Sequence, residues 1–422
     1  HKSFPKDSAA TISWVVTAYS ILFGSLLIVS GRMADQVGRR KFFLTGTGLF
    51  LLGSLVCATS GTMAMLILGR AVQGVGGAMM TPASTGLLLG AFPAEKRGQV
   101  MAWTGSIGAL GVASGPTLGA FVVSTFGWRS AFWINVPICI VTIVLAVRVT
   151  NESEAQKGTR PDFLAAVFLT AAVGSLVWGI SRSEDYGWGH SSVLELFAAA
   201  LVLGLLVTWR SVSHADPLLP AQLFKEKTFT LGNISTMMYA AAFSGNILNN
   251  VLFQRTIWKF TATKAGWFSV LSPITVAVTS MIIGRKMAGI GYKKLLVTGP
   301  LVMSSTVMGS VLFLHVKPTP WFPFLPLMFL LGIGLGATFP AQSAVTILRL
   351  PPHRFALGGA INNTFRQVGS AIGVALVVTV QSQTKGINGF RNGWKVAICF
   401  ALLSAGVSLF QPGKSQQQPS PT

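Results

Sequence analysis

Two arginines lie deep inside long apolar stretches of this sequence. Arg70 falls within residues 64–91 and Arg366 within residues 357–380. A charged side chain in an apolar surrounding is costly, so it is by default part of a proton, ion or substrate pathway. For Arg70 the alternative is structural, with the guanidinium reaching a membrane interface or binding backbone carbonyls. Gln73 follows Arg70 by three residues and is expected on the same helix face.

Acidic residues are scarce, and their positions limit the chemistry. Of the 11 Asp and Glu residues, only Glu195 lies within an apolar stretch, near its outer end. Proton coupling ordinarily needs a titratable carboxylate in the pathway, and none is convincing here. No nucleophile–base set, phosphate-binding loop or metal cluster is visible, so neither an enzyme nor a cofactor is indicated. Cys57, Cys139 and Cys399 lie singly in apolar stretches, which argues against a disulfide framework.

Composition indicates a polytopic membrane protein built of helices. The chain has 422 residues, of which 51% are hydrophobic and 10% charged, whereas soluble domains carry roughly 25% charged residues. Its mean hydropathy is +0.61. Thirteen stretches have about the length needed to cross ~30 Å of hydrocarbon: residues 12–31, 42–60, 64–91, 98–124, 130–149, 163–181, 192–210, 229–251, 265–284, 295–314, 323–347, 357–380 and 394–411.

The distribution of basic residues between these stretches predicts the orientation. Of the 32 Lys and Arg residues, 19 fall on one alternating set of loops and 11 on the other. The richer set is expected in the cytoplasm, which places the C-terminus inside and residues 1–11 outside a cell membrane. This loop pattern accounts for the net charge of +21, so we do not expect nucleic acid as a partner.

Two short segments resemble each other and indicate related halves. Gly31–Lys41 reads GRMADQVGRRK, and Gly284–Lys294 reads GRKMAGIGYKK. Both are expected to be cytoplasmic loops with glycine at the first and eighth positions, and glycine allows helix ends to turn tightly. Duplicated halves are common in secondary transporters, where the substrate is held near the bilayer midplane.

Gly31–Lys41 resembles the loop called motif A of the major facilitator superfamily. The resemblance implies a conformational gate, carried by Gly31, Asp35, Gly38, Arg39, Arg40 and Lys41. A carboxylate such as that of Asp35 can cap a helix N-terminus or pair with an arginine. The alternative is an ordinary basic loop that only sets topology. The second segment carries Ala288 in place of Asp35, so any charge contact there must differ.

Two further segments extend the resemblance. Leu68–Ala78, read LGRAVQGVGGA, is similar to motif B of the same family and implies a role in proton coupling for Arg70 and Gln73. Gly105–Ala120 resembles motif C, which is associated with antiporters and implies export, through Gly111, Gly115, Pro116 and Gly119. Glycine at every fourth position also makes a smooth stripe for helix packing, and proline allows a kink.

Between the two halves lie two further stretches, 163–181 and 192–210, which imply the 14-helix drug:proton antiporter branch. The expected fold is two six-helix bundles plus this central pair, with the first bundle short of one helix because a single stretch precedes Gly31. The chain is then a fragment or an incomplete sequence. The predicted parts are an N-terminal bundle (1–149), a central linker with the extra helices (150–227), a C-terminal bundle (228–412) and a polar cytoplasmic tail (413–422).

The resemblance predicts export of hydrophobic or amphipathic compounds, lipophilic or cationic, driven by proton exchange through alternating access. The expected partners are then protons, the lipid bilayer and these compounds, and a proton gradient is the driving force. Residues proposed to line a substrate cavity are Tyr19, Asn246, Asn249, Asn250, Gln254, Asn362, Asn363 and Arg366, although helix-packing hydrogen bonds use the same residue types. Two alternatives stay open: an exporter of one metabolite, lipid or siderophore, and a truncated chain that does not transport.

Overall fold

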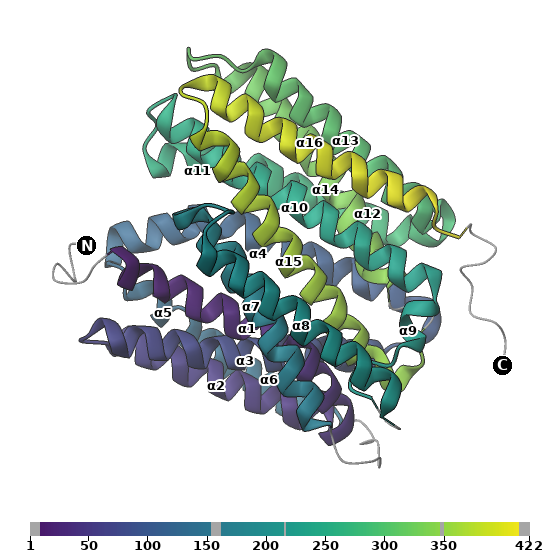
Figure 1. Ribbon diagram of the computed structural model, residues 1–422. Helices are drawn as coiled ribbons and strands as arrows, with labels where there is room; N and C mark the ends of the chain where they lie inside the picture. Colours follow the sequence, from purple (N-terminus) through teal and green to yellow (C-terminus); the bar gives the residue numbers. More distant parts are fainter. Residues whose placement is uncertain (1–8, 153–161, 215–216, 347–349, 413–422) are drawn as a thin grey trace. The chain divides into compact units, whose positions relative to one another are not determined.

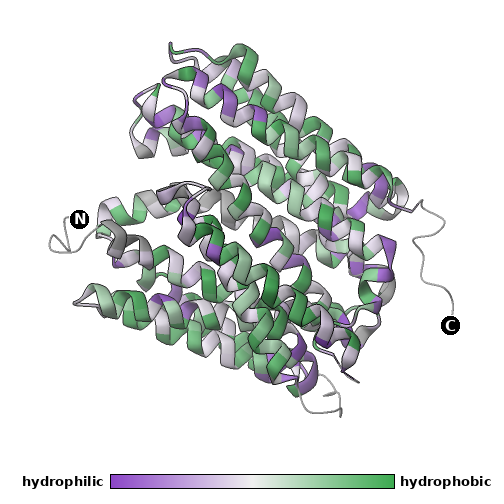
Figure 2. Cartoon of the chain, in the orientation of Figure 1, coloured by the Kyte–Doolittle hydropathy of each residue, from purple (hydrophilic) through white to green (hydrophobic). Residues whose placement is uncertain are grey.

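The described part of the chain folds into helices. The structure, a computed structural model, covers residues 9–152, 162–214, 217–346 and 350–412, and these ranges contain no strand (Figure 1). Along the helices apolar residues predominate, and hydrophilic ones gather toward the connections (Figure 2). Within these described ranges, ten helical segments are long and apolar enough to cross a membrane: Trp14–Val37, Arg39–Thr59, Met63–Ala91, Ser130–Val149, Leu164–Ser183, Ser191–Ser213, Thr263–Met287, Tyr292–Phe313, Pro320–Val345 and Ile387–Leu409.

Three other helices coincide with predicted spans but are not among these ten. They are α4 (Ala94–Phe126), α10 (Lys227–Thr256) and α15 (Phe355–Ser382). Each is long enough to cross a bilayer. Amide and charged side chains lower the hydropathy of α10 and α15, and α4 is rich in glycine, serine and threonine. For these three helices, spanning therefore stays a prediction.

The segment 31–41, expected to be a loop, is almost entirely helical. Helix α1 runs from Ala9 to Val37 and α2 from Arg39 to Thr59, so that Gly38 alone separates them. Backbone hydrogen bonds continue up to the junction, with the N–H of Gly38 donating to Ala34 at 3.2 Å. The same correction applies to 284–294, where α12 (Leu271–Ile290) and α13 (Tyr292–Phe313) meet at Gly291. Hydropathy alone ends a span too early, because a helix continues beyond its apolar part.

The described helices group into two compact units. Unit 1 comprises residues 1–91, 122–221 and 351–364, and unit 2 comprises residues 92–121, 222–350 and 365–422. Helices α4 and α15 therefore each contribute residues to both units. The division predicted from chain order, at residues 149, 227 and 412, stays a prediction.

Unit 1 is built on the packing of α1 and α2 against α3 (Met63–Ala91), with the hairpin α7–α8 against α1. A small core contains Cys57, Met63 and Leu66, with Trp128 and Phe132 packed on it. The remaining helices of the unit are α5 (Ser130–Trp133), α6 (Asn135–Val149), α7 (Phe163–Tyr186), α8 (Ser191–Ser213) and the short η2 (Pro352–Arg354).

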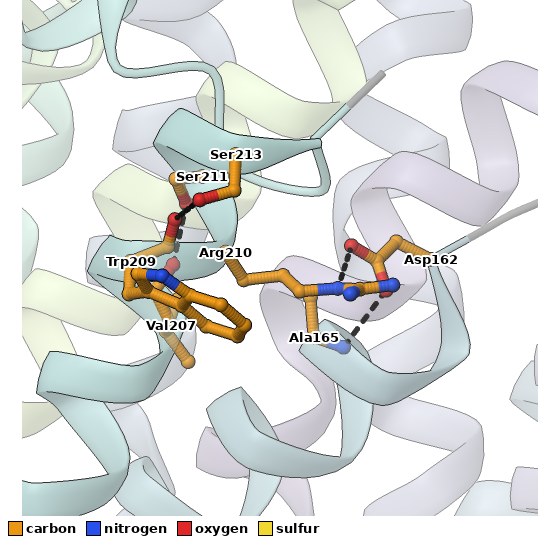
Figure 3. A network of polar contacts seen from close by, with 7 residues as sticks. All are labelled: Asp162, Ala165, Val207, Trp209, Arg210, Ser211 and Ser213. Carbon is orange, nitrogen blue, oxygen red and sulfur yellow. Dashed lines mark hydrogen bonds and ion pairs between the residues drawn. The ribbon is translucent and has the colours of Figure 1, made fainter. Parts of the chain in front are cut away.

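An ion pair joins the two helices of the α7–α8 hairpin at one end (Figure 3). The carboxylate of Asp162 accepts the N–H of Ala165 at 3.1 Å and so caps the N-terminus of α7. It also accepts hydrogen bonds from Arg210 Nε on α8, at 2.9 and 3.1 Å to its two oxygens. Burial raises the pKa of Asp162, but the Ala165 N–H, the Arg210 guanidinium and His214 lower it more, so its net pKa lies below the usual value.

Unit 2 has a larger aromatic core. Phe253 lies at its centre, with ring centroids 5.0 Å from Trp258, 5.7 Å from Phe390 and 5.1 Å from Trp394. Its remaining elements are α9 (Gln222–Lys225), α11 (Ala262–Ser269), η1 (Pro320–Phe324), α14 (Leu325–Val345) and α16 (Ile387–Leu409). Within the unit α15 lies so close to α10 that an added Cβ at Gly369 would overlap the carbonyl group of Met237, and one at Gly373 that of Ala241.

Candidate functional site

The two copies of the repeat share one backbone feature. Gly38 has a φ of +117° and Gly291 a φ of +91°. Each is the eighth residue of its copy, and each is the single residue between two long helices. Residues with a Cβ rarely adopt such a φ, which explains why both junctions carry glycine.

Asp35 in unit 1 makes both of the contacts expected of it. Its Oδ1 accepts a hydrogen bond from Arg39 Nε at 2.8 Å and lies 2.7 Å from Arg39 Nη2. Its Oδ2 accepts the backbone N–H of Leu357 at 3.1 Å, in the first turn of α15. Arg39 also donates from Nη1 to the carbonyl of Gly86 on α3 at 3.0 Å. One buried carboxylate therefore holds an arginine and a helix N-terminus together.

His353 stands directly before α15 and close to this ion pair. Burial lowers the pKa of His353, and the positive charges of Arg354, Arg32 and Arg39 lower it further. Burial and these three positive charges therefore disfavour the protonated imidazole at His353.

Arg40 and Lys41 bind the segment that follows α6. The two carboxylate oxygens of Glu152 accept the backbone N–H groups of Arg40 and Lys41, at 3.0 and 3.1 Å. Arg40 Nη2 donates to the carbonyl of Val147 near the end of α6 at 2.6 Å. Glu152 was not identified as a site residue from the sequence. The one feature that could have pointed to such a residue is Gly38, which has no side chain to cap α2.

Arg70 lies at the centre of a polar network in unit 1. Its Nε donates to the carbonyl of Val15 at 2.9 Å, and its Nη1 donates to Gln73 Oε1 at 3.0 Å. Its guanidinium lies 4.2 Å from the ring centroid of Tyr19. Gln73 in turn donates to the hydroxyl of Ser54 at 2.7 Å. The structure brings together the predicted Tyr19, Arg70 and Gln73.

The network continues through residues that were not predicted. Ser54 on α2 accepts a weaker hydrogen bond from Asn135 Nδ2 on α6, at 3.4 Å. Among the described residues, the ion pairs Asp35–Arg39 and Asp162–Arg210 do not involve Arg70. The arginine binds a backbone carbonyl, as its structural alternative requires, and a buried amide, so these contacts fit both interpretations.

The predicted antiporter residues lie in the middle of α4. A Cβ added at Gly111, Gly115 or Gly119 would meet no atom of the described residues within 4 Å. The backbone of α4 is helical throughout, and the side chain of Pro116 lies outside the described part. The role of this stripe stays a prediction.

Three of the predicted cavity residues serve helix packing in unit 2. Asn249 donates to the carbonyl of Phe390 at 2.9 Å and contacts the amide of Gln381. Asn250 accepts the indole N–H of Trp394 at 2.8 Å. Gln254 donates to the carbonyl of Asn250 at 3.2 Å and to Ser269 at 3.1 Å. These contacts favour the structural alternative for all three.

Asn246 differs from its neighbours on α10. It is 1% exposed, and neither atom of its side-chain amide has a hydrogen-bond partner among the described residues. Buried polar groups are nearly always hydrogen-bonded, so this amide calls for an explanation.

Asn362 and Asn363, the two asparagines of α15 that were predicted as cavity residues, lie in unit 1. Asn363 donates to the carbonyl of Gly359 at 3.0 Å, and Asn362 is buried at 4% exposure.

Arg366 lies beside an aromatic group that was not predicted. Its guanidinium is 5.6 Å from the ring centroid of Phe339, and its Nη2 donates to Ser343 Oγ at 3.3 Å. The ring of Phe339 meets those of Tyr239 and Phe243 edge to face, at 5.6 and 5.1 Å. Tyr239, Phe243 and Asn246 follow the spacing of one helix face, a signal that could have grouped them.

Comparison with known proteins agrees with the helical architecture. The Major Facilitator Superfamily sequence profile matches residues 6–374 and, in a second match, residues 232–421. The fold is similar to that of the human organic anion transporter MFSD10, with a TM-score of 0.70 at 16% identity over 94% of this chain and 83% of that one.

Several bacterial resistance proteins are similar in sequence. The tetracenomycin C resistance and export protein of Streptomyces glaucescens is 27% identical over 92% of this chain and 72% of its own length. The lincomycin resistance protein LmrB of Listeria monocytogenes is 28% identical over 89% of this chain and 79% of its own length. Multidrug resistance protein 3 of Bacillus subtilis is 27% identical over 91% of this chain and 75% of its own length.

Proposed function

Because the chain belongs to the major facilitator superfamily, it is a secondary transporter rather than an enzyme, and we propose that it exports hydrophobic or amphipathic compounds in exchange for protons. The observation that carries this proposal is the similarity to resistance proteins along about nine-tenths of the chain, 92% for the tetracenomycin C relative. Motif C on α4 supports the outward direction.

The gate in this proposal is the junction between α1 and α2. Asp35 holds Arg39 and the first turn of α15 at once, so breaking the ion pair leaves an uncompensated buried charge, and breaking the other contact leaves a helix N–H without its acceptor. Because both contacts depend on the one carboxylate of Asp35, this junction suits a two-state switch, as alternating access requires. Arg70 and Gln73 are the proposed coupling residues, since Arg70 is a half-buried cation within a span.

Placement in the 14-helix branch is also proposed, supported by the α7–α8 hairpin between α6 and α10 in chain order. The membrane is proposed to be the cell membrane, with a cytoplasmic C-terminus, on the strength of the unequal loop charges. A second candidate is export of one specific compound, which is favoured by a relative named for tetracenomycin C alone.

The test is efflux from proteoliposomes that contain the purified full-length protein. A panel of amphipathic fluorescent probes with negative, zero and positive charge is loaded inside, and a pH gradient is imposed in either direction. We expect gradient-dependent loss of at least one probe above that of protein-free vesicles. If no probe leaves faster under any gradient, the proposed export is wrong.

A variant pair tests the coupling role. Arg70→Lys keeps the charge but cannot bridge Val15 and Gln73 at once, so the pH-driven rate should fall about tenfold, the effect of one lost charge-assisted hydrogen bond. Arg255→Lys makes the same change at an exposed position and should leave the rate unchanged. Equal rates for Arg70→Lys and wild type would argue against the assignment.

A further inference from the structure

The second half of the chain carries positive charge without any acidic residue. From Lys227 to the C-terminus the sequence has 16 Lys and Arg residues and no Asp or Glu. In all the residues of unit 2 the acids are Glu95 and Glu226, one in the first turn of α4 and the other directly before α10. A cation that entered the interior of unit 2 would therefore find no carboxylate there.

One group in this unit combines three buried aromatic rings with the half-buried positive charge of Arg366. We call Tyr239, Phe243, Phe339 and Arg366 the aromatic–arginine cluster. The three rings are each 9% exposed or less, and the Arg366 guanidinium lies over Phe339 at 5.6 Å. Aromatic faces attract cations, but here a guanidinium already occupies that role, and its charge repels a second cation.

Asn246 adds an unused hydrogen-bonding group beside the cluster. It follows Phe243 by three residues on α10, on the face that also carries Tyr239. Among the described residues, neither the donor nor the acceptor of its amide has a partner, whereas the amides of Asn249 and Asn250 both form hydrogen bonds. A buried amide without a hydrogen-bond partner destabilises the protein. A polar ligand that bonded to this amide would remove that free-energy penalty.

We propose that this cluster and Asn246 recognise an amphipathic organic anion, namely an aromatic compound that bears a carboxylate or a similar acidic group. The ring packs against Tyr239, Phe243 and Phe339, and the acidic group accepts hydrogen bonds from Arg366 and from the Asn246 amide. A planar guanidinium matches a carboxylate in geometry and charge. The inference rests on the proposed export function and replaces the expected lipophilic or cationic compounds with organic anions.

The deciding experiment compares two probes with the same xanthene ring system and opposite charge. Carboxyfluorescein is an anion and rhodamine 123 is a cation. Efflux of each is measured from proteoliposomes of the full-length protein, and binding is measured separately by fluorescence polarisation in detergent. We expect carboxyfluorescein to be bound and exported with an apparent affinity at least about tenfold higher than that of rhodamine 123.

Variants assign the preference to the cluster. Arg366→Gln should raise the KM for carboxyfluorescein about tenfold or more and leave rhodamine 123 unchanged or improved, and Asn246→Leu should raise it less. Arg366→Lys should recover part of the affinity. Lys385→Gln, which removes one charge at an exposed position of the same unit, is the matched control and should behave as wild type.

The outcomes separate the two proposals. Export of rhodamine 123 without binding of carboxyfluorescein would overturn the anion inference and leave the export function standing. If neither probe nor any other compound moves, export is wrong, while the binding measurement still decides whether the cluster takes an anion. If Arg366→Gln weakens the binding and export of both probes equally, the cluster is structural and the inference fails.

Discussion

At the scale of single residues, Glu152 compensates for a defect at the start of α2. The first N–H groups of a helix have no partner within it, and Gly38 has no side chain to supply one. The carboxylate of Glu152 accepts two of these groups, from Arg40 and Lys41. The fixed φ of +117° at Gly38 and the capping glutamate are therefore complementary: glycine allows the turn, and a distant residue provides the cap.

Replacing Glu152 should destabilise unit 1 modestly. Glu152→Ala removes both acceptors and should lower the free energy of unfolding by about 1 kcal/mol, in the range of other N-cap losses. Glu152→Gln keeps one oxygen and should cost less. Thermal unfolding in detergent measures the effect, with Glu195→Ala, an exposed glutamate on α8, as the control. A Glu152→Ala protein as stable as that control would contradict the capping role.

At the scale of elements, the α7–α8 hairpin should be sensitive to acid. The folded-state pKa of Asp162 lies below its usual value, so the carboxylate contributes stability above the unfolded pKa of about 3.9. That contribution is lost as the pH falls from about 4 through the folded-state pKa.

The prediction is a loss of about 1 kcal/mol between neutral pH and pH ~3, because one carboxylate loses at most about 1.4 kcal/mol for each pH unit below its unfolded pKa. Asp162→Asn should be less stable at pH 7 and should lack this acid-dependent step. The melting temperature measured against pH for both proteins checks it. The same slope in Asp162→Asn as in wild type would show that another group titrates.

Two glycine stripes should respond differently to substitution. Gly373 lies against the carbonyl of Ala241, whereas Gly115 meets no described atom within 4 Å of an added Cβ. Gly373→Ala should therefore destabilise unit 2 by about 3 kcal/mol, because backbone must move. Gly115→Ala should leave stability unchanged or slightly improved, since alanine favours helix.

Yield and thermal stability on size-exclusion chromatography measure both variants. If Gly115→Ala is folded but exports more slowly, α4 acts in transport rather than in stability. Equal destabilisation by the two substitutions would show that α4 is packed as closely as α15.

Element positions followed from the sequence, but their ends and partners did not. The described residues of every predicted span are mainly helical, because apolar length is a strong signal, although the spans 130–149, 265–284 and 323–347 each cover two consecutive helices. The segment 31–41 was wrong as a loop, since helical hydrogen bonding continues into polar residues. Asp35 was predicted to cap or pair, and it does both. Glu152 could not be predicted, because its hydrogen-bond partners lie 111 and 112 residues away in the sequence.

The candidate site was predicted in residue type rather than in arrangement. Amides on α10 were grouped as cavity residues, yet Asn249, Asn250 and Gln254 bind neighbouring helices and only Asn246 is left without a partner. Which amide is satisfied depends on the residue opposite it, and a single sequence does not contain that information. Aromatic residues such as Phe339 were overlooked because they are equally common in any apolar core.

At the scale of the whole molecule, the sign of the substrate's charge decides how a membrane potential drives export. If one anion leaves for each proton that enters, two elementary charges move inward per cycle. An interior-negative potential of 100 mV then contributes about 4.6 kcal/mol, at about 2.3 kcal/mol per charge. If one cation leaves for each proton, no net charge moves, and the potential contributes nothing.

Export of carboxyfluorescein should therefore accelerate when potassium and valinomycin make the proteoliposome interior negative at a fixed pH gradient, and it should slow when the interior is positive. Efflux rate against imposed potential is the measurement, and protein-free vesicles correct for leakage. Since carboxyfluorescein can carry more than one negative charge, a singly charged aromatic carboxylate serves as the control for stoichiometry. A rate independent of potential would mean that the exchange is electroneutral, and a one-for-one exchange of an anion for a proton would then be wrong.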